Sequence, residues 1–189
     1  MCGIVGAVAQ RNVYPILIEG LRRLEYRGYD SAGYSVIASD GLQTRKAVGK
    51  VAQLEAAAAA NPADGRVGIA HTRWATHGEP SDINSHPHNS GSLSVVHNGI
   101  IENHEVLRAE LQAAGYDFLS ATDTEVVAHL LHRACKTAPT LSAAVEAVLP
   151  LLEGAYALAV IDANQPGELV ATRCGSPLVI ALSGVNVVF

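Results

Sequence analysis

Apolar residues along the chain follow two patterns. Short, nearly continuous apolar runs bounded by glycine or polar residues are typical of buried strands. They predict strands over residues 3–9, 34–38, 42–48, 67–71, 93–97, 156–161, 169–173 and 178–182. Apolar residues spaced three and four positions apart predict helices over residues 13–26, 51–60, 103–115, 122–136 and 141–152. No repeat or linker interrupts the pattern, and we expect a single α+β domain.

Turn and cap residues mark several of these boundaries. Asp40-Gly41 is typical of a tight hairpin between two strands. Asn103 can cap the helix that follows it, and Thr122 with Glu125 matches the capping-box pattern of the next helix. Residues 73–92 form a long polar stretch, and a loop of such length in a compact domain is usually functional. The sequence stops within an apolar run, so we expect the domain, residues 2–189, to be incomplete at its C-terminal end.

The composition argues against several classes of protein. Of the 189 residues, 49% are hydrophobic, which is enough for one core, and the net charge of -5 is unlike that of a nucleic-acid-binding protein. No apolar run approaches the ~20 residues of a membrane helix, and the N-terminus lacks a secretory signal. The odd number of cysteines, Cys2, Cys135 and Cys174, is typical of a reducing, cytoplasmic setting. We expect Cys135 and Cys174 to be buried and inert.

Cys2 is the first candidate for chemistry because it follows the initiator methionine directly. Removal of Met1 would place a thiol and a free α-amine on one residue. The reference pKa values of these groups are about 8.5 and 7.7–8.0, so a nucleophile and a base would act together near neutral pH. The alternative is a small residue that merely begins a buried strand.

Three further polar groups are candidates, each with a structural alternative. Arg73 has the side chain best shaped to hold a carboxylate through two hydrogen bonds, but it can also form an ordinary ion pair on a loop. Asn98-Gly99 is typical of a hairpin turn, but an amide beside a glycine N–H also suits an oxyanion hole. Asp123 either begins a helix favourably or holds a substrate ammonium group.

The order of these groups resembles that of a known family. The motifs are Cys-Gly-Ile-Val-Gly at residues 2–6, Leu-Glu-Tyr-Arg-Gly-Tyr-Asp-Ser-Ala-Gly at 24–33, His-Thr-Arg-Trp-Ala-Thr-His-Gly-Glu-Pro at 71–80, His-Asn-Gly-Ile-Ile-Glu-Asn at 97–103, Thr-Asp-Thr-Glu at 122–125 and Gly-Ser-Pro-Leu at 175–178. Together they closely resemble the glutaminase domain of the glutamine–fructose-6-phosphate aminotransferase family. The first two motifs are shared with other N-terminal-nucleophile amidotransferases, whereas segments 73–80 and 98–103 favour the sugar enzymes.

The resemblance implies a four-layer αββα sandwich of the N-terminal-nucleophile hydrolase type. It implies that Cys2 is the nucleophile, that its own α-amine is the base, and that Asn98 and Gly99 form the oxyanion hole. The expected reaction is hydrolysis of L-glutamine to glutamate and ammonia through a γ-glutamyl thioester on Cys2.

The resemblance also implies how glutamine is bound. Arg73 would hold the α-carboxylate with help from Thr76 and His77, and Asp123 with the Gly99 carbonyl would hold the α-ammonium group. Two supporting roles follow in the same way: Arg27 would help to position the N-terminal residue, and Trp74 would lie where ammonia leaves.

The expected partners are L-glutamine and a C-terminal sugar isomerase domain of the same polypeptide, which binds fructose 6-phosphate and is absent from this chain. The resemblance implies a cytoplasmic homodimer for the full-length enzyme, with no cofactor and no membrane or nucleic-acid partner. We expect no metal, because His86-Pro87-His88 has no cysteine or acid at ligand spacing.

Three rival hypotheses remain open from the sequence. A chain that retains Met1 would have an amide in place of the base, and would be a catalytically silent glutamine-binding module. An N-terminal-nucleophile amidohydrolase for other amides would not need Arg73 together with Asp123. The glutaminase domain of another amidotransferase is the third.

Overall fold

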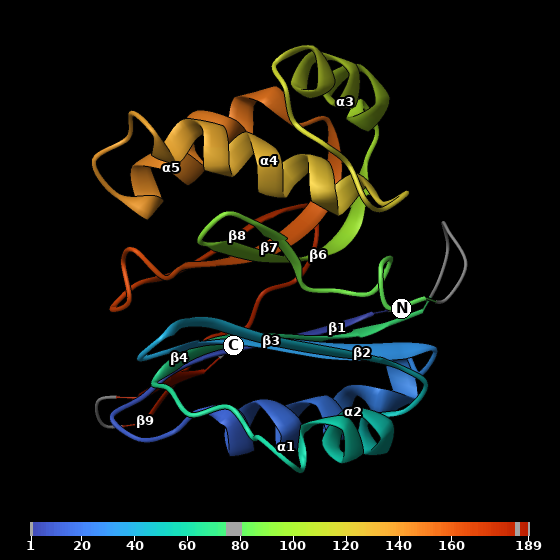
Figure 1. The fold of residues 1–189 in the computed structure, drawn as a ribbon, viewed down its shortest axis with the longest axis vertical. Coiled ribbons are helices and arrows are strands. Elements are labelled where there is room, and N and C mark those ends of the chain that lie inside the picture. Colours follow the sequence, from blue (N-terminus) through green and yellow to red (C-terminus); the bar gives the residue numbers. More distant parts are fainter. Residues whose placement is uncertain (1, 75–80, 184–185, 189) are drawn as a thin grey trace.

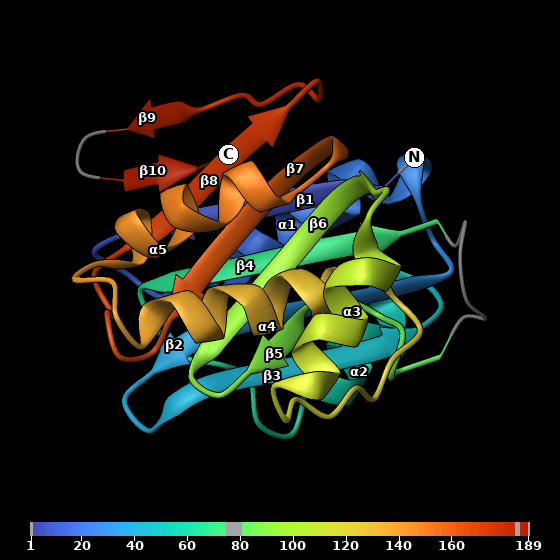
Figure 2. The same ribbon diagram turned by 90° about the horizontal axis from the view of Figure 1, so that it is seen from above.

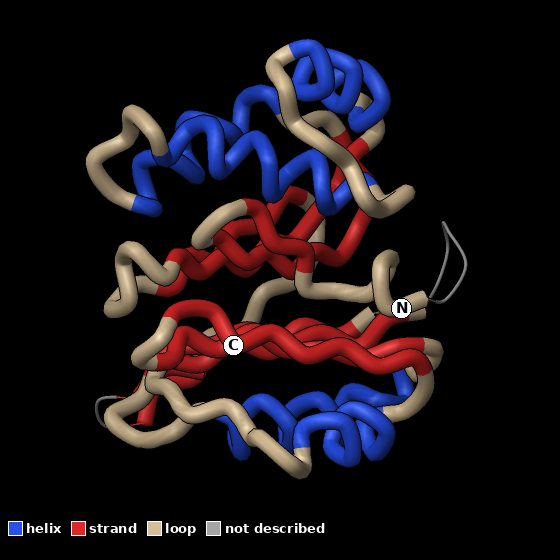
Figure 3. Tube along the Cα trace, in the orientation of Figure 1, coloured by secondary structure: helices blue, strands red, loops and turns tan. Residues whose placement is uncertain are grey.

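The structure is a computed structural model that describes residues 2–74, 81–183 and 186–188. Two β-sheets lie face to face in the middle of the molecule, and a layer of helices covers the outer face of each sheet (Figure 1). Figure 3 shows the same layers by type, with the strands inside and the helices outside. The predicted α+β fold class and its four-layer αββα arrangement are confirmed.

The first sheet carries the N-terminal strand. Its order is β3-β2-β4-β1-β10-β9, and every neighbouring pair is antiparallel. The strands are β1 (Gly3–Val8), β2 (Ser31–Ala38), β3 (Gly41–Val48), β4 (Val67–Arg73), β9 (Ala181–Ser183) and β10 (Asn186–Val188). Ala38 pairs with Gly41, which confirms the hairpin predicted at Asp40-Gly41.

The second sheet has the order β5-β6-β7-β8 and is also antiparallel. Its strands are β5 (His88–Ser90), β6 (Leu93–Ile101), β7 (Gly154–Asp162) and β8 (Leu169–Cys174). Viewed from above, β6 and β7 cross over the strands of the first sheet at an angle (Figure 2). This crossing brings the end of β6 over the beginning of β1, where the N-terminus lies.

The helices form two separate outer layers. The helices α1 (Tyr14–Leu24) and α2 (Val51–Ala58) cover the first sheet. The helices α3 (His104–Ala113), α4 (Asp123–Cys135) and α5 (Leu141–Val148) cover the second. Short 3₁₀ turns, Glu25–Arg27 and Leu149–Leu151, extend α1 and α5, so the predicted helices over 13–26 and 141–152 each end in a tighter turn.

Three apolar clusters hold the four layers together. One lies between α1, α2 and the first sheet, and a second between the second sheet and α3, α4 and α5. The third lies between the two sheets and includes Ile69, Val96 and Ile161. Strands that are buried on both faces need apolar residues at successive positions, which explains the continuous apolar runs in the sequence.

Two local interpretations of the sequence are wrong. Asn98-Gly99 is not a hairpin turn, because β6 continues through both residues and pairs with β7 as far as Ile101. Thr122 and Glu125 do not form a capping box: the Thr122 side chain makes no cap bond, and the Glu125 carboxylate accepts the N–H groups of Leu119 and Ser120 instead.

Two further corrections concern segments near the end of the chain. The strand predicted over 178–182 begins only at Ala181. Cys174 is exposed and Cys135 is half-buried, so neither thiol is as enclosed as expected. Among the helices that the structure describes, none combines the length and the apolar character needed to cross a membrane.

Candidate active site

A cavity of about 60 Å³ lies where β1 begins and β4 ends. Several of the sequence candidates meet in it, although they come from both sheets and from α4. Its described lining consists of Cys2, His71, Arg73, Trp74, His86, His97, Gly99, Thr122, Asp123 and Thr124.

The strand register brings Cys2 to the end of β4. Gly3 of β1 pairs with Thr72 of β4, so Cys2 lies beside the residues that follow Thr72. The Trp74 N–H donates to Cys2 Sγ at 3.3 Å, and the thiol lies 3.7 Å from the Trp74 carbonyl oxygen. The backbone of Trp74 therefore holds the sulfur at the end of β4. The Trp74 side chain is 46% exposed and makes an edge contact with Tyr29.

Asn98 joins the N-terminal strand to the second sheet. Its Nδ2 donates to the Cys2 carbonyl oxygen at 3.3 Å, and its Oδ1 lies 2.9 Å from Nε2 of His71. The same His71 nitrogen lies 3.1 Å from the His97 carbonyl oxygen. The amide group of Asn98 is therefore held on both sides, next to the candidate nucleophile.

The pairing of β6 with β7 requires glycine at position 99. Its φ is +123°, a conformation that residues with a side chain rarely adopt. A Cβ at this position would lie 2.0 Å from the Ala155 carbonyl oxygen in β7. The missing side chain therefore faces the neighbouring strand β7.

Asp123 begins α4, and its carboxylate is fixed by groups from β6. The Ile101 N–H donates to Oδ2 at 2.9 Å, and Nδ1 of His97 lies 3.6 Å from Oδ1. Burial alone would raise the pKa of this carboxyl, but the His97 ring and the Ile101 N–H outweigh it and lower the pKa to about 2. Asp123 is therefore a carboxylate at neutral pH.

Arg73 supplies the opposite charge in the same cavity. It is only 5% exposed, which is unusual for an arginine. The Arg27 loop lies against it, since a Cβ at Gly28 would lie 2.8 Å from the Arg73 carbonyl oxygen. Arg27 is half-buried and lies outside the described lining of the cavity. The predicted contacts of Thr76 and His77 lie outside the described residues.

Three histidines for which the sequence predicted no role lie together at the cavity, and two of them, His71 and His86, line it. We refer to His71, His86 and His88 as the histidine cluster. The His71 and His86 rings stack with centroids 4.1 Å apart, and the His88 ring meets His86 edge-on at 5.0 Å. Burial lowers the pKa of all three, that of His71 to about 3, so the cluster is neutral at physiological pH.

One feature of the sequence could have pointed to His71 of this cluster and to the neighbouring His97. His71 and His97 each interrupt a buried, largely apolar strand, and a polar residue in such a place needs a partner. Among the described residues, no group of three histidine, cysteine or acidic side chains is arranged to hold a metal ion.

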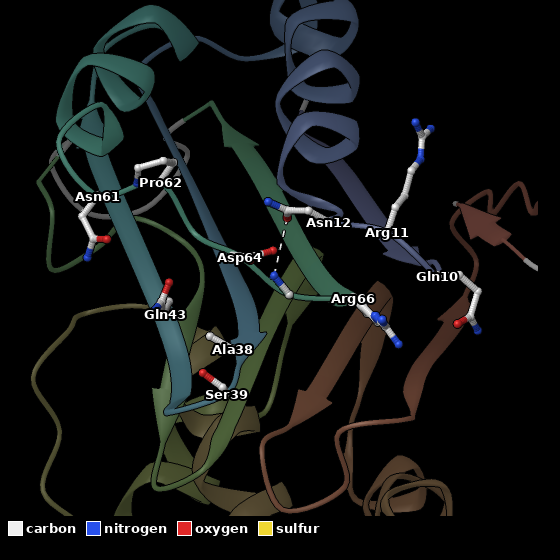
Figure 4. Close-up of a pocket in the computed structure, with 11 residues that line it drawn as sticks. Gln10, Arg11, Asn12, Ala38, Ser39, Gln43, Asn61, Pro62, Asp64 and Arg66 are labelled. Carbon is white, nitrogen blue, oxygen red and sulfur yellow. Dashed lines mark hydrogen bonds between the residues drawn. The ribbon is translucent and has the colours of Figure 1, made fainter.

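A larger hollow of about 480 Å³ lies at the other end of β1 (Figure 4). β1 spans six residues at ~3.3 Å each, which separates this hollow from Cys2 by about the length of the strand. Arg11 and Arg66 point in different directions there, and the Asn12 amide binds backbone groups of Ala63 and Gly65. These side chains do not converge on a common point, so the smaller cavity at Cys2 is the candidate site.

Comparison with known proteins gives consistent similarities. Residues 71–189 match the family described as a glutamine amidotransferase domain. The chain is 61% identical over 184 residues to a glutamine–fructose-6-phosphate aminotransferase (isomerizing) of Pseudomonas putida, and 60% identical over 183 residues to that of Escherichia coli K12. Its fold resembles that of glutamine phosphoribosylpyrophosphate amidotransferase from B. subtilis with a TM-score of 0.85 and 28% identity, covering 100% of this chain and 41% of that one.

The two aminotransferases are much longer than the chain. In both cases the similarity covers 96% of this chain and 30% of the relative.

Proposed function

The chain belongs to the glutamine amidotransferase domain family, and we propose that it hydrolyses L-glutamine to glutamate and ammonia with Cys2 as nucleophile. One observation carries the proposal. A thiol, a buried arginine and an ionised aspartate line the same cavity, which provides a nucleophile together with both charges that an α-amino acid head group requires.

The reaction begins with the thiol of Cys2. With Met1 removed, the α-amine accepts the thiol proton, and the thiolate attacks the side-chain carbonyl carbon of glutamine. The oxygen becomes an oxyanion, which the Asn98 amide and the Gly99 N–H stabilise. The carbon–nitrogen bond then breaks as the α-ammonium returns its proton to the leaving nitrogen, so ammonia leaves and a γ-glutamyl thioester remains. Water attacks the thioester, and glutamate is released with the thiol restored.

The head group of glutamine is recognised by charge. Arg73 binds the α-carboxylate in a two-pronged contact, and Asp123 with the Gly99 carbonyl binds the α-ammonium group. Thr76 and His77 assist Arg73, Arg27 supports the N-terminal residue, and Trp74 borders the route by which ammonia leaves. The low pKa of Asp123 supports this assignment, because the carboxylate stays charged across the physiological range.

We propose further that ammonia passes to a sugar isomerase domain beyond this chain, which converts fructose 6-phosphate to glucosamine 6-phosphate. The support is the ~60% identity to aminotransferases of which this chain covers 30%. The full-length enzyme would be a cytoplasmic homodimer.

The test is glutamate and ammonia release by full-length protein whose intact mass shows that Met1 is absent. We expect turnover of glutamine, trapping of the thioester on Cys2 by mass spectrometry, and no turnover by Cys2→Ala. Full turnover by a uniformly Met1-retaining sample would refute the α-amine as base. Binding of glutamine without turnover by the processed protein would instead support a silent binding module, and equal turnover of amides without an α-amino acid head group would support a general amidohydrolase.

A further inference from the structure

We propose that His71 is a positioning residue that holds the Asn98 amide in the orientation required for the oxyanion hole. This inference rests on the proposed function and adds a residue to it. His71 lies in β4 of the first sheet and Asn98 in β6 of the second, so their contact joins the two sheets next to Cys2.

The contacts of the ring determine which nitrogen carries the proton. Nε2 of His71 lies 3.1 Å from the His97 carbonyl oxygen, which can only accept a hydrogen bond. Nε2 must therefore be an N–H. Because it also lies 2.9 Å from the side chain of Asn98, the Asn98 atom facing it must be the acceptor Oδ1.

The orientation of the amide follows at its other end. With Oδ1 facing His71, Nδ2 faces the N-terminal strand, where it donates to the Cys2 carbonyl oxygen at 3.3 Å. A backbone carbonyl therefore anchors each end of the chain His97–His71–Asn98–Cys2. Nδ2 has a second hydrogen that this network does not use, and it is available to an oxyanion formed on the substrate of Cys2.

The ring is also held in one protonation state. It is 1% exposed and stacks on His86, and burial keeps its pKa at about 3. A neutral ring with Nε2–H has a bare Nδ1, and that atom is buried without a hydrogen-bond partner among the described residues. The His71 ring thus acts toward Asn98 only as a donor, and its role does not change across physiological pH.

Loss of this donor would free the amide to rotate by half a turn. Oδ1 would then take the place of Nδ2 beside Cys2, and a carbonyl oxygen would meet the developing negative charge in place of an N–H. The substrate head group does not touch Asn98 in the proposed mode of binding, so the rate should fall with little change in KM.

Two substitutions separate the hydrogen bond from burial. In His71→Gln the side-chain amide nitrogen takes roughly the place of Nε2 and can still donate to Asn98. In His71→Asn the same amide group is one methylene shorter and does not reach. We expect His71→Gln to stay within a few-fold of wild-type kcat for glutamine hydrolysis. We expect His71→Asn to lose about 10- to 100-fold, the loss that follows when a residue that orients a metal ligand is removed. Equal kcat values for the two variants, whether high or low, would overturn the proposal.

A double-substitution experiment tests whether His71 acts through Asn98. Asn98→Ala alone should lower kcat by about 10²–10³, the usual loss for one oxyanion donor. Adding His71→Asn to Asn98→Ala should lower it little further, since no amide remains to be oriented. His129→Asn is the matched control. His129 is a buried histidine of α4 whose ring makes two hydrogen bonds, with Ser90 and the Asp117 carbonyl, and its loss should lower Tm with kcat unchanged. If the double variant loses kcat by the product of the two single-variant factors, His71 acts independently of Asn98, and the proposal is overturned.

The tautomer can be measured without any substitution. In ¹⁵N-histidine-labelled wild-type protein, His71 should show the Nε2–H tautomer from about pH 5 to 8. An Nδ1–H tautomer or a protonated ring would overturn the proposal even if both His71 variants failed to fold. Absence of glutaminase activity in the processed wild type would refute the proposed function itself, whereas an active wild type with the wrong tautomer would refute only the role of His71.

Discussion

Gly99→Ala tests whether the sheet or the substrate requires glycine beside Asn98. Alanine would have to adopt a φ of +123°, and its Cβ would lie 2.0 Å from the Ala155 carbonyl oxygen and 2.8 Å from the Tyr156 Cα. Both contacts are backbone atoms of the paired strand β7, which cannot rotate away as a side chain can. Either β6 moves away from β7 or the backbone at Gly99 changes its conformation.

The cost has two separable parts. A residue with a Cβ at positive φ costs about 1–3 kcal/mol, and overpacking against a rigid neighbour costs about 1–3 kcal/mol more. We therefore expect Gly99→Ala to lower the free energy of unfolding by about 2–6 kcal/mol, a large part of the ~5–15 kcal/mol of a typical domain. Gly41→Ala is a matched control, because Gly41 has a φ of +115° and nothing lies within 4 Å of its added Cβ.

Urea unfolding of the two variants measures the difference. Both substitutions restrict the unfolded chain equally, so this effect cancels in the comparison. Gly41→Ala should show the backbone cost alone, and Gly99→Ala should be less stable than Gly41→Ala by about 1–3 kcal/mol. If the two variants are equally stable to within about 0.5 kcal/mol, the contact with β7 is not what requires glycine, and the reasoning from the strand pairing fails.

Three further results are expected. Asp123→Asn should lower kcat/KM for glutamine by roughly 30- to several-thousand-fold, because the substrate ammonium loses a desolvated partner worth about 2–5 kcal/mol. An unchanged kcat/KM together with a lower Tm would contradict this. The histidine cluster has pKa values below the unfolded value of ~6.5, so the native state binds fewer protons than the unfolded state below that pH. The free energy of unfolding should therefore fall as the pH decreases from about 6.5 towards 4, by up to ~1.4 kcal/mol per histidine and pH unit, and equal urea midpoints at pH 7 and 5 would exclude this. Cys174, which is exposed, should be alkylated faster than Cys135, whose pKa is raised by burial, and peptide mapping after brief iodoacetamide treatment distinguishes them.

The layered fold is predictable from sequence because burial on both faces of a strand leaves a clear mark. The largely apolar runs over 67–71 and 156–161 predict strands, and β4 and β7 lie there. Element ends are less predictable where tertiary partners replace local ones. Glu125 matches a capping box in sequence, but its carboxylate binds the loop N–H groups of Leu119 and Ser120 because the chain folds back over α4.

The candidate site likewise contains residues that the sequence could predict and residues that it could not. Cys2, Arg73 and Asp123 could be chosen from their chemistry, and all three line one cavity. Asn98-Gly99 was ambiguous, because the turn signal reflects the preference of glycine for positive φ, and here a strand satisfies that preference. The roles of His71 and His97 depend on contacts between two sheets, which no local pattern encodes.

The position of the site follows from strand register and alternation. His71 and Arg73 are two residues apart in β4, so they share one face of the strand. Both line the cavity, one in contact with Asn98 and the other carrying a positive charge. A slip of one residue between β1 and β4 would turn both side chains to the opposite face and would move Cys2 away from Trp74. The pairing that builds the core therefore also sets the geometry of Cys2, Asn98 and Arg73, the proposed nucleophile, oxyanion donor and carboxylate-binding residue. Substitutions that weaken β1–β4 pairing should impair glutamine hydrolysis before they unfold the domain.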